Sequence, residues 1–309
     1  MSNLIKRMLQ IPKARLIKKL LGYDEIYTIG IRFRSSDSLL DGKNKIFYPI
    51  PYSDEFWYAD PIAWEHNGKT YLFAEAYDRH KHKGHIVVAE IQDDIRDIQF
   101  KKIIDEPYHM SFPMIFSWEN DIYMLPETSE NYSLNIYKAE QFPLLWRKVA
   151  EIKTDKMLVD SVLMKNTSKG IVLLSSEICQ DNPLYVKFCY NLLDMKKHAI
   201  LPIENQQERG YNLQDRAAGV PFEYKNKYIL PTQISTECDY GVKIAFCYLL
   251  DTEFNIYQEF TVDDVSVAGI NCKDMIGIHT YGQTSKVEFI DLRYLKFSPV
   301  NQYKKIIQK

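Results

Sequence analysis

The sequence predicts an all-β fold, a five-bladed β-propeller with a short N-terminal amphipathic helical segment. Three observations carry this prediction: aromatic residues are abundant, short apolar strands alternate with turn sequences, and the pattern recurs about every fifty residues. The 22 Tyr and 15 Phe outnumber the 12 Gly and suit pleated, half-buried surfaces. A period of this length favours sheets arranged radially over a β-sandwich.

Composition and charge exclude several classes of protein. The 309 residues are 46% hydrophobic, which is too apolar for a disordered chain. With 39 basic and 41 acidic residues the net charge is -2, so we expect no nucleic-acid partner, because polyanions are bound by a positive field. The five cysteines are odd in number and scattered, which favours a reducing compartment over a secreted disulfide framework.

Residues 1–23, MSNLIKRMLQIPKARLIKKLLGY, form the first predicted segment. Apolar pairs recur at a spacing of three to four residues beside six basic residues, and no acid occurs before Asp24. Pro12 divides the pattern into two short helices. One interpretation is a basic helix, residues 1–22, that lies on an anionic membrane surface; the alternative is a helix that caps the domain. Residues 24–309 then form a single propeller domain.

Five blocks after residue 58 share a pattern of apolar strand, polar turn and second apolar strand. They are ADPIAWEHNGKTYLFAEAYD (59–78), SFPMIFSWENDIYMLPETSE (111–130), VDSVLMKNTSKGIVLLSSE (159–177), RAAGVPFEYKNKYILPTQ (216–233) and VAGINCKDMIGIHT (267–280). Equivalent points fall near residues 60, 112, 160, 217 and 268. One further strand or more follows each block, and residues 24–58 are expected to supply the strand that closes the ring.

In a propeller the innermost strands surround one central channel, so equivalent positions of different blades should converge. The polar residues at such positions are Asp60, His109, Ser111, Asp160 and Arg216 at the start of the first strands, and Glu75, Glu127, Glu177, Gln233 and His279 at the end of the second. Asp239 follows the Gln233 strand. Because such groups are costly to bury unpaired, the pattern predicts a polar funnel that binds one or two sugar rings. Glu177 is the weakest candidate, because its strand is less regular.

Carboxylates in such a funnel can divide acid and base work, so Asp60, Glu127 and Asp160 are the predicted catalytic residues. Glu75, His109, Ser111, Arg216, Gln233, Asp239 and His279 are the predicted substrate-binding residues. Alternatives remain for several of them: Asp60 can cap a turn, Arg216 can form a structural ion pair, and the histidines can be core residues. No metal motif is present, and the histidine-rich run RHKHKGH (79–85) is expected to be a solvated hairpin tip.

The blocks resemble a known propeller family. ADPIAWEHNGKTYLFAEAYD, YHMSFPMIFSWENDIYMLPETSENYSLNIYKAEQFP, VDSVLMKN, RAAGVPFEYKNKYILPTQ with CDYG, and GIHT are similar to the N-terminal domain of plant glucosamine inositolphosphorylceramide transferases. Bacterial relatives occur in surface-polysaccharide clusters. The blades look more distantly like arabinanase- and invertase-type glycoside hydrolases. That resemblance implies that Asp60 is base or nucleophile and that Asp160 tunes the acid, for which Glu127 is our choice.

The resemblance implies carbohydrate chemistry but leaves its direction open. We expect a glycosyltransferase of bacterial cell-surface polysaccharide assembly (capsule, exopolysaccharide or O-antigen), which moves a sugar from a nucleotide donor to a lipid-linked or glycan acceptor. Asp60 would deprotonate the acceptor hydroxyl and Arg216 would hold the donor phosphates, with no cofactor or metal. Alternatives are a glycoside hydrolase and a non-catalytic carbohydrate-binding propeller. A chain with a basic N-terminus and no export signal is expected in the cytoplasm, on the inner face of the membrane.

Overall fold

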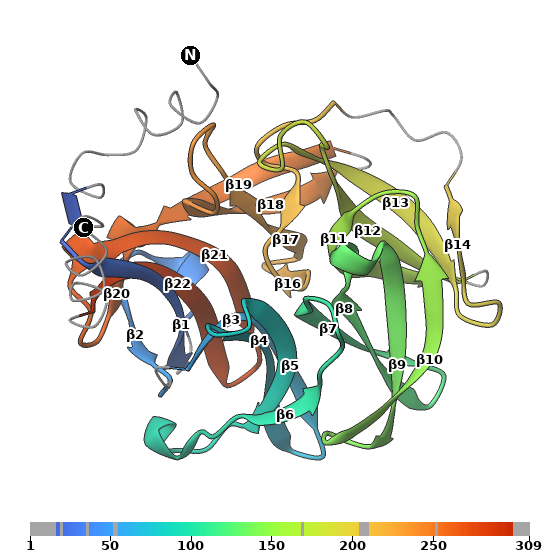
Figure 1. Ribbon diagram of the computed structural model, residues 1–309, viewed down its shortest axis with the longest axis horizontal. Coiled ribbons are helices and arrows are strands. Elements are labelled where there is room, and N and C mark those ends of the chain that lie inside the picture. Colours follow the sequence, from blue (N-terminus) through green and yellow to red (C-terminus); the bar gives the residue numbers. More distant parts are fainter. Residues whose placement is uncertain are drawn as a thin grey trace.

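A computed structural model describes residues 17–18, 21–34, 37–51, 55–167, 170–203, 210–250 and 253–298. Five β-sheets surround a common centre, so the five-bladed propeller is confirmed (Figure 1). No α-helix of seven residues or more occurs in these ranges, where five 3-10 turns join the strands. These turns are η1 (Leu39–Asp41), η2 (Ile95–Asp97), η3 (Ser129–Asn131), η4 (Val262–Asp264) and η5 (Cys272–Asp274).

Blades 1 to 3 are antiparallel sheets of four strands that follow the chain outward from the centre. Blade 1 contains β3 (Phe56–His66), β4 (Lys69–Asp78), β5 (Lys83–Glu90) and β6 (Lys101–Ile104). Blade 2 contains β7 (Ser111–Trp118), β8 (Asp121–Glu127), β9 (Ser133–Gln141) and β10 (Leu145–Lys153). Blade 3 contains β11 (Leu158–Thr167), β12 (Gly170–Ile178), β13 (Val186–Asp194) and β14 (Ala199–Pro202).

Blades 4 and 5 depart from this simple order. Blade 4 contains β15 (Arg216–Ala217) and β16 (Phe222–Tyr224), which both pair with β17 (Lys227–Ile234), and then β18 (Lys243–Leu250) and β19 (Glu253–Thr261). Blade 5 contains β21 (Met275–Gln283), β22 (Val287–Phe297), β1 (Tyr23–Phe33), β2 (Lys45–Pro49) and β20 (Val265–Val267). Its innermost strand is therefore followed by strands from both ends of the described chain.

Two-residue hairpins join the inner strands as the turn sequences predict. Asn67 and Gly68 connect β3 to β4 with φ of 50° and 75°, and Lys225 and Asn226 connect β16 to β17 with φ of 46° and 60°. Paired positive φ angles are the type I′ geometry that matches the twist of antiparallel strands. Asn and Gly tolerate this region best, which explains why these turns were recognisable in the sequence.

The pairing of β1 with β22 closes the ring. The two strands pair antiparallel over the whole length of both, from Tyr23 opposite Phe297 to Phe33 opposite Val287. Strand β2 then pairs with β1, and β20 adds to β2 in parallel. The prediction that residues 24–58 supply a closing strand is confirmed, since β1 and β2 both belong to the last blade.

The apolar core lies between neighbouring blades, where the faces of adjacent sheets meet. Ile29 and Phe289 of blade 5, for example, pack in one cluster with Leu72 and Val87 of blade 1. Each of these four side chains is at least 97% buried, and burial of one such side chain contributes about 1.5–3 kcal/mol. This packing holds neighbouring blades in fixed positions relative to one another. It therefore also fixes where the inner strand ends lie around the centre.

Residues 1–16 and 19–20, which carry most of the predicted amphipathic helix, lie outside the described residues. Lys18 is described: its ammonium group donates to the carbonyl of Lys273, 3.0 Å away, and contacts the carboxylate of Asp274. Both partners belong to the turn before β21. In the part of the chain that the structure covers, no helix is long and apolar enough to cross a bilayer.

Candidate functional site

The same β-bulge recurs in the inner strands of four blades. In each, two residues of the inner strand lie opposite one residue of the next strand. The doubled residues are Asp60 and Pro61 in β3, Phe112 and Pro113 in β7, Asp160 and Ser161 in β11, and His279 and Thr280 in β21. Asp60, Phe112 and Asp160 have left-handed φ angles of 51°, 43° and 46°. Such bulges re-aim a side chain, and here they bring Asp60, Asp160 and His279 to the centre.

This register corrects the sequence prediction in two places. The fifth equivalent point is His279 rather than a residue near 268, because η4, β20 and η5 extend the connection before the last blade. His279 therefore lies in an innermost strand and not at the end of a second strand. Asp60 lies in a bulge within β3 and does not cap a turn, and the bulge also accommodates Pro61.

The bulges surround a central cavity of about 170 Å³. Eight of the ten predicted site residues line it: Asp60, Glu75, His109, Ser111, Glu127, Asp160, Arg216 and His279. They come from the inner strands of all five blades, from second strands β4 and β8, and from the loop before β7. Residues far apart in the sequence thus share one small space, although their catalytic and binding roles stay predictions.

Gln233 and Asp239 do not line the cavity. The Gln233 amide lies behind the inner strand of blade 4 and donates to the carbonyl of Ala217, 3.4 Å away. The Asp239 carboxylate accepts from Arg293 at 2.8 Å, outside the cavity wall. Gln233 is thus bonded within blade 4 and Asp239 to blade 5, and their predicted substrate-binding roles stay predictions. Glu177, the weakest candidate, pairs with Lys156 and Lys187 and is also absent from the lining.

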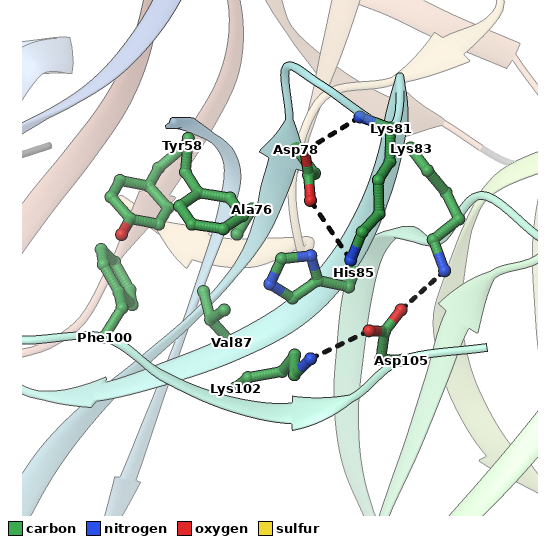
Figure 2. Close-up of a pocket in the computed structure, with 11 residues that line it drawn as sticks. Tyr58, Ala76, Asp78, Lys81, Lys83, His85, Val87, Phe100, Lys102 and Asp105 are labelled. Carbon is green, nitrogen blue, oxygen red and sulfur yellow. Dashed lines mark hydrogen bonds and ion pairs between the residues drawn. The ribbon is translucent and has the colours of Figure 1, made fainter. Parts of the chain in front are cut away.

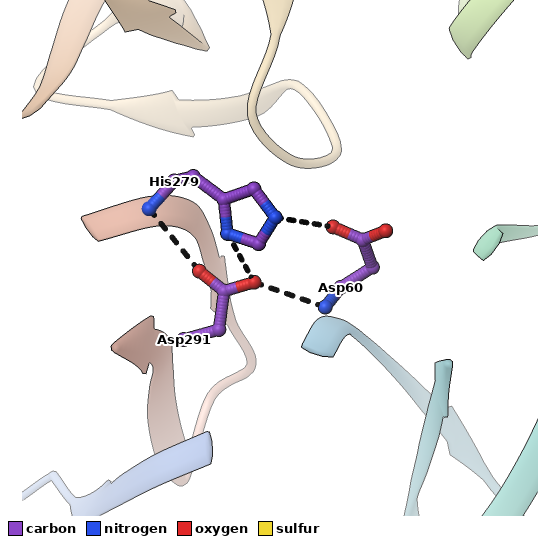
Figure 3. A group of neighbouring side chains, drawn as sticks. All are labelled: Asp60, His279 and Asp291. Carbon is purple, nitrogen blue, oxygen red and sulfur yellow. Dashed lines mark hydrogen bonds and ion pairs between the residues drawn. The ribbon is translucent and has the colours of Figure 1, made fainter. Parts of the chain in front are cut away.

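Asp60 forms a buried cluster with His279 and Asp291 (Figure 3). The hydroxyl of Thr280 donates to Asp60 Oδ1 at 2.9 Å, and the backbone N–H of Phe112 donates to Oδ2 at 3.2 Å. His279 lies between the two carboxylates, with Nε2 3.5 Å from Asp60 Oδ1 and Nδ1 2.5 Å from Asp291 Oδ2. The imidazole thus links the two acids.

Asp291, on β22, fixes the backbone around this cluster. Its side chain is fully buried. It accepts from the backbone N–H groups of Asp60 at 3.0 Å, His279 at 3.2 Å and Thr280 at 2.7 Å. One carboxylate therefore ties the bulge of blade 1 to the bulge of blade 5. Sequence reasoning missed Asp291, because it lies inside an apolar second strand and its partners depend on the bulge.

Burial and neighbouring charges shift the pKa values in this cluster. Burial, together with the nearby acids Asp291 and Asp160, raises the pKa of Asp60 to about 6, although His279 opposes the rise. Burial works against the charge of His279, but Asp291 and Asp60 outweigh it and raise the pKa of the imidazole. An ionised Asp60 and a protonated His279 therefore stabilise each other.

On the other side of the cavity Asp160, Glu127 and Arg216 form a second cluster. The guanidinium of Arg216 donates from Nε to Asp160 Oδ2, and its plane lies 4.8 Å from the ring centre of Tyr240. Glu127 hydrogen-bonds Asp160 and accepts from the Ser129 hydroxyl at 2.8 Å. Burial raises the pKa of Asp160 to about 7 and also raises that of Glu127, while Arg216 limits both shifts. A proton shared between these two carboxyl groups is therefore favoured near neutral pH.

Glu75 and His109 form a third contact at the cavity wall. The backbone N–H of Gly84 donates to His109 Nδ1 at 3.0 Å, which places the imidazole proton on Nε2, 3.6 Å from Glu75 Oε1. Glycine is required here because a Cβ would lie 2.5 Å from both Glu75 Oε1 and the carbonyl of Met110. Burial among several acids raises the pKa of Glu75 well above its usual value, and burial lowers that of His109. Burial therefore favours the uncharged form of both groups.

Aromatic rings form the remaining wall. Trp57 stacks on Tyr77 with ring centres 4.3 Å apart, and Tyr27 contacts both Trp57 at 4.7 Å and His279 at 4.9 Å. These rings and Tyr240 line the cavity together with the acids. Such a surface suits a sugar, because apolar ring faces can lie on aromatic side chains while hydroxyls reach the polar groups. Sequence reasoning missed Tyr27 and Tyr240, which come from β1 and from the loop before β18.

The donor set at Asp60 could also hold a cation. One ligand atom each from Asp60, His279 and Asp291 lies within 4.8 Å of the others. Yet His279 already contacts both carboxylates, and Asp291 is occupied by three backbone N–H groups. These donor atoms thus already take part in an ion-pair and hydrogen-bond network within the protein.

Fold and site define a class: a five-bladed propeller whose central cavity is lined by several carboxyl groups, one guanidinium and aromatic rings. Comparison with known proteins narrows this class. Residues 50–274 match the family model described as glucosamine inositolphosphorylceramide transferase 1, N-terminal, and the chain belongs to this family. The predicted resemblance is thereby confirmed.

Curated relatives match over a shorter stretch. The chain is 36% identical over 108 residues to glucosamine inositolphosphorylceramide transferase 1 of Oryza sativa subsp. indica, which covers 35% of the chain and 14% of the relative. The Arabidopsis thaliana protein of the same name is 36% identical over 107 residues, with 34% and 14% covered. The alignments thus span about one seventh of the plant proteins.

Solved structures share the fold at low identity. The catalytic domain of the GH62 α-L-arabinofuranosidase of Coprinopsis cinerea has a TM-score of 0.51 at 12% identity, with 88% of this chain and 97% of that chain covered. A GH62 hydrolase in complex with xylotriose has a TM-score of 0.52 at 12% identity, with 87% and 97% covered. At these identities the likeness establishes the propeller fold alone.

Proposed function

We propose that this protein transfers a sugar from a nucleotide donor to a glycan or lipid-linked acceptor, with Asp60 as the catalytic base. The observation that carries the proposal is the buried Asp60 carboxylate, which opens into the central cavity with a pKa of about 6. A group with this pKa is ionised at neutral pH yet basic enough to accept a proton. The transferase names of the plant relatives support the direction of the reaction.

The chemical step is a substitution at the anomeric carbon of the donor sugar. The acceptor hydroxyl oxygen forms a bond to that carbon while its proton passes to a carboxylate oxygen of Asp60. The bond between the anomeric carbon and the phosphate oxygen breaks, and its electron pair leaves with the nucleoside diphosphate. Thr280 and the N–H of Phe112 hold the Asp60 carboxylate in place, and the charge of His279 keeps it ionised.

The charges inside the cavity favour the sugar ring over the phosphates. The lining contains four carboxyl groups, of Asp60, Glu75, Glu127 and Asp160, against the single guanidinium of Arg216. That guanidinium is already paired with Asp160, as the ion-pair alternative predicted. In our proposal Arg216 therefore holds Asp160 and Glu127 in position. It does not hold the donor phosphates, which is the role that the sequence suggested. The sugar ring occupies the cavity, and the diphosphate lies outside its rim.

Glycoside hydrolysis is a second candidate, because the two carboxyl clusters differ in protonation. Asp60 is ionised near neutral pH while Asp160 and Glu127 share a proton, which supplies the base and acid that hydrolysis requires. In that reaction a water replaces the acceptor hydroxyl, and Glu127 protonates the leaving oxygen. Transfer and hydrolysis thus share Asp60 and differ in the molecule that it activates.

The test is a product assay with the complete chain, a panel of sugar nucleotides and a glycolipid acceptor. We expect a larger glycolipid and free nucleoside diphosphate, and a rate 10²- to 10⁴-fold lower for Asp60→Asn, the usual contribution of a general base. Asp121→Asn, an exposed partner of Lys138, is the matched control and should leave the rate unchanged. Monosaccharide release from glycans would favour hydrolysis. Ligand binding without turnover, equal in Asp60→Asn, would contradict both reactions and favour a binding module.

Membrane attachment belongs to the same proposal. A basic helix over residues 1–22 would keep the enzyme at the cytoplasmic face of the membrane, where lipid-linked acceptors of surface-polysaccharide assembly are presented. Flotation with phosphatidylglycerol vesicles should recover the complete chain but not a chain that begins at Tyr23. Equal recovery of both, or recovery with neutral phosphatidylcholine vesicles, would contradict the attachment and favour the alternative, a helix that caps the domain.

A further inference from the structure

A second cavity lies on the outer side of blade 1. It has a volume of about 200 Å³, and we call it the side pocket; its main walls are Tyr58, Asp78, His85, Phe100, Lys102 and Asp105. Figure 2 shows Tyr58 and Phe100 on one side, Lys102 and Asp105 on the other, and His85 between them. The three histidines of RHKHKGH separate here: His80 and His82 are exposed, whereas His85 is 93% buried. The expectation of a solvated tip therefore fails for His85.

The side pocket and the central cavity lie back to back. Successive residues of a strand point to opposite faces of the sheet. Trp57 of β3 and Tyr77 of β4 line the central cavity, whereas their neighbours Tyr58 and Asp78 line the side pocket. The two cavities therefore share the same ends of the same two strands, at the end of the propeller where the central cavity lies.

His85 provides a buried polar group that faces the side pocket. His85 belongs to the pocket wall, and its ring contacts Phe56 edge-on, with the ring centres 5.5 Å apart. Burial lowers the pKa of this imidazole, so it is neutral at pH 7 and can donate one hydrogen bond and accept another. A ligand hydroxyl in the pocket can therefore exchange hydrogen bonds with this ring.

Charge distinguishes this pocket from the central cavity. Lys81, Lys83 and Lys102 contribute three positive charges, against two negative charges from Asp78 and Asp105. Asp105 pairs with Lys83 at 2.7 Å and Lys102 at 3.0 Å, which holds both ammonium groups at the wall. The side pocket therefore carries an excess of positive charge, whereas the central cavity carries an excess of acidic groups.

Aromatic rings complete the pocket. Tyr58 and Phe100 have ring centres 4.4 Å apart, and both belong to the pocket wall. Together they offer an apolar surface on which the face of a sugar ring can lie. An aromatic wall, a largely buried imidazole and two ion-paired lysines therefore occur within one cavity.

We propose that the side pocket binds an acidic saccharide unit, a sugar ring that carries a carboxylate or a phosphate group, at a site separate from the central cavity. The ring lies on Tyr58 and Phe100, a hydroxyl hydrogen-bonds His85, and the anionic group faces Lys102 and Lys83. This assignment does not depend on the reaction proposed for Asp60, because it concerns binding alone.

The test is a titration of the complete chain, monitored by NMR signals of the histidine rings and by calorimetry. The probes are glucuronic acid, glucose 1-phosphate, neutral glucose and inorganic phosphate. We expect binding of at least one acidic sugar, with a shift of the His85 signals, and weaker or no binding of glucose and inorganic phosphate. Glucuronic acid and glucose 1-phosphate distinguish the carboxylate from the phosphate as the recognised group.

Two variants locate the site. Lys102→Ala should weaken binding about tenfold, the usual effect of losing one charge-assisted hydrogen bond, and the neighbouring Lys101→Ala is the matched control because Lys101 lies outside the pocket. Both lysines are exposed enough for the fold to tolerate the change. Asp60→Asn should leave this binding unchanged even if it abolishes turnover. Absence of binding by both acidic sugars, equal binding of glucose or phosphate, or equal effects of the two lysine variants would overturn the proposal.

Discussion

Asp60 and Asp160 occupy equivalent bulge positions of blades 1 and 3, yet their surroundings differ. Both have left-handed φ angles and are at least 94% buried. Asp60 is balanced by an imidazole that is itself held by Asp291, whereas Asp160 is balanced by the guanidinium of Arg216 and hydrogen-bonds a second acid, Glu127.

This difference shows that the backbone fixes where a carboxyl group lies, while the neighbouring blades fix its protonation. His279 can gain or lose a proton near neutral pH, so the charge around Asp60 responds to pH. Arg216 stays charged. Asp160 and Glu127 therefore gain or lose protons beside a constant positive charge. Four variants test this contrast, from the largest expected effect to the smallest.

Asp291→Asn should have the largest effect on stability. The amide nitrogen of asparagine would face the N–H of Asp60 and the ring of His279, so buried donors lose their acceptor. We expect the free energy of unfolding, measured in urea, to fall by about 2–4 kcal/mol, which is the range for disrupting a buried charged network. The pKa of His279, followed by NMR, should fall because the acid that raises it is gone. An unchanged histidine titration would contradict the role assigned to Asp291.

Arg216→Leu should destabilise the protein by a smaller amount, about 1–3 kcal/mol at pH 8, because Asp160 can take up a proton once its partner is lost. The loss should shrink toward pH 5, where Asp160, whose pKa is about 7, is protonated in both proteins. Arg147→Leu, which removes an exposed ion pair with Glu140, is the matched control and should cost under about 0.5 kcal/mol. A loss independent of pH would argue against proton uptake.

Stability should fall as pH rises from about 4 to 7. A carboxyl group whose pKa is raised by folding binds its proton more tightly in the folded chain, so its contribution is complete below the unfolded pKa. That contribution is lost as pH passes the folded value, which is about 6 for Asp60 and about 7 for Asp160. In Asp160→Asn the free energy of unfolding should fall by about 1–3 kcal/mol less over this pH range, as measured by urea unfolding at each pH. A steeper decline in the variant would contradict the raised pKa.

Glu75→Gln should have the smallest effect, under about 0.5 kcal/mol at pH 7, because burial favours the neutral form of Glu75 and glutamine has nearly the same shape. Above pH 8 the variant should become the more stable protein, since only the native side chain then acquires a buried charge. Thermal unfolding at pH 7 and pH 9 measures both differences. Marked destabilisation at pH 7 would show that Glu75 is ionised in the folded protein.

The fold was predictable because each inner hairpin carries its own local signal. Turn sequences such as Asn67-Gly68 mark strand ends, and the fifty-residue period orders the first four blades. The fifth blade broke the period because its outer strands come from the N-terminal part of the chain, while its inner strand begins only at Met275. A search for a regular step therefore placed the fifth equivalent point about ten residues too early.

The cavity lining was predictable where a polar residue recurs at an equivalent point of the repeat, as Asp60 and Asp160 do, or ends a second strand, as Glu127 does. Asp291 was missed because a buried acid in the middle of an apolar strand carries no pattern that reveals its partners. Gln233 and Asp239 lie outside the cavity lining, because sequence proximity to a strand end does not say which face a side chain takes. Register at the bulges decides that, and it emerges only when the strands pair.

Ring closure between β1 and β22 has a consequence for synthesis on the ribosome. Asp60 is made early, but His279, Thr280 and Asp291 emerge more than two hundred residues later. Until then the nascent polypeptide has no charge partner for this acid, and β1 presents an unpaired edge. Contacts of such long sequence separation form slowly, so maturation of the centre is the last event of folding. A chaperone that shields β1 during this interval would raise the yield of active molecules without touching the finished protein.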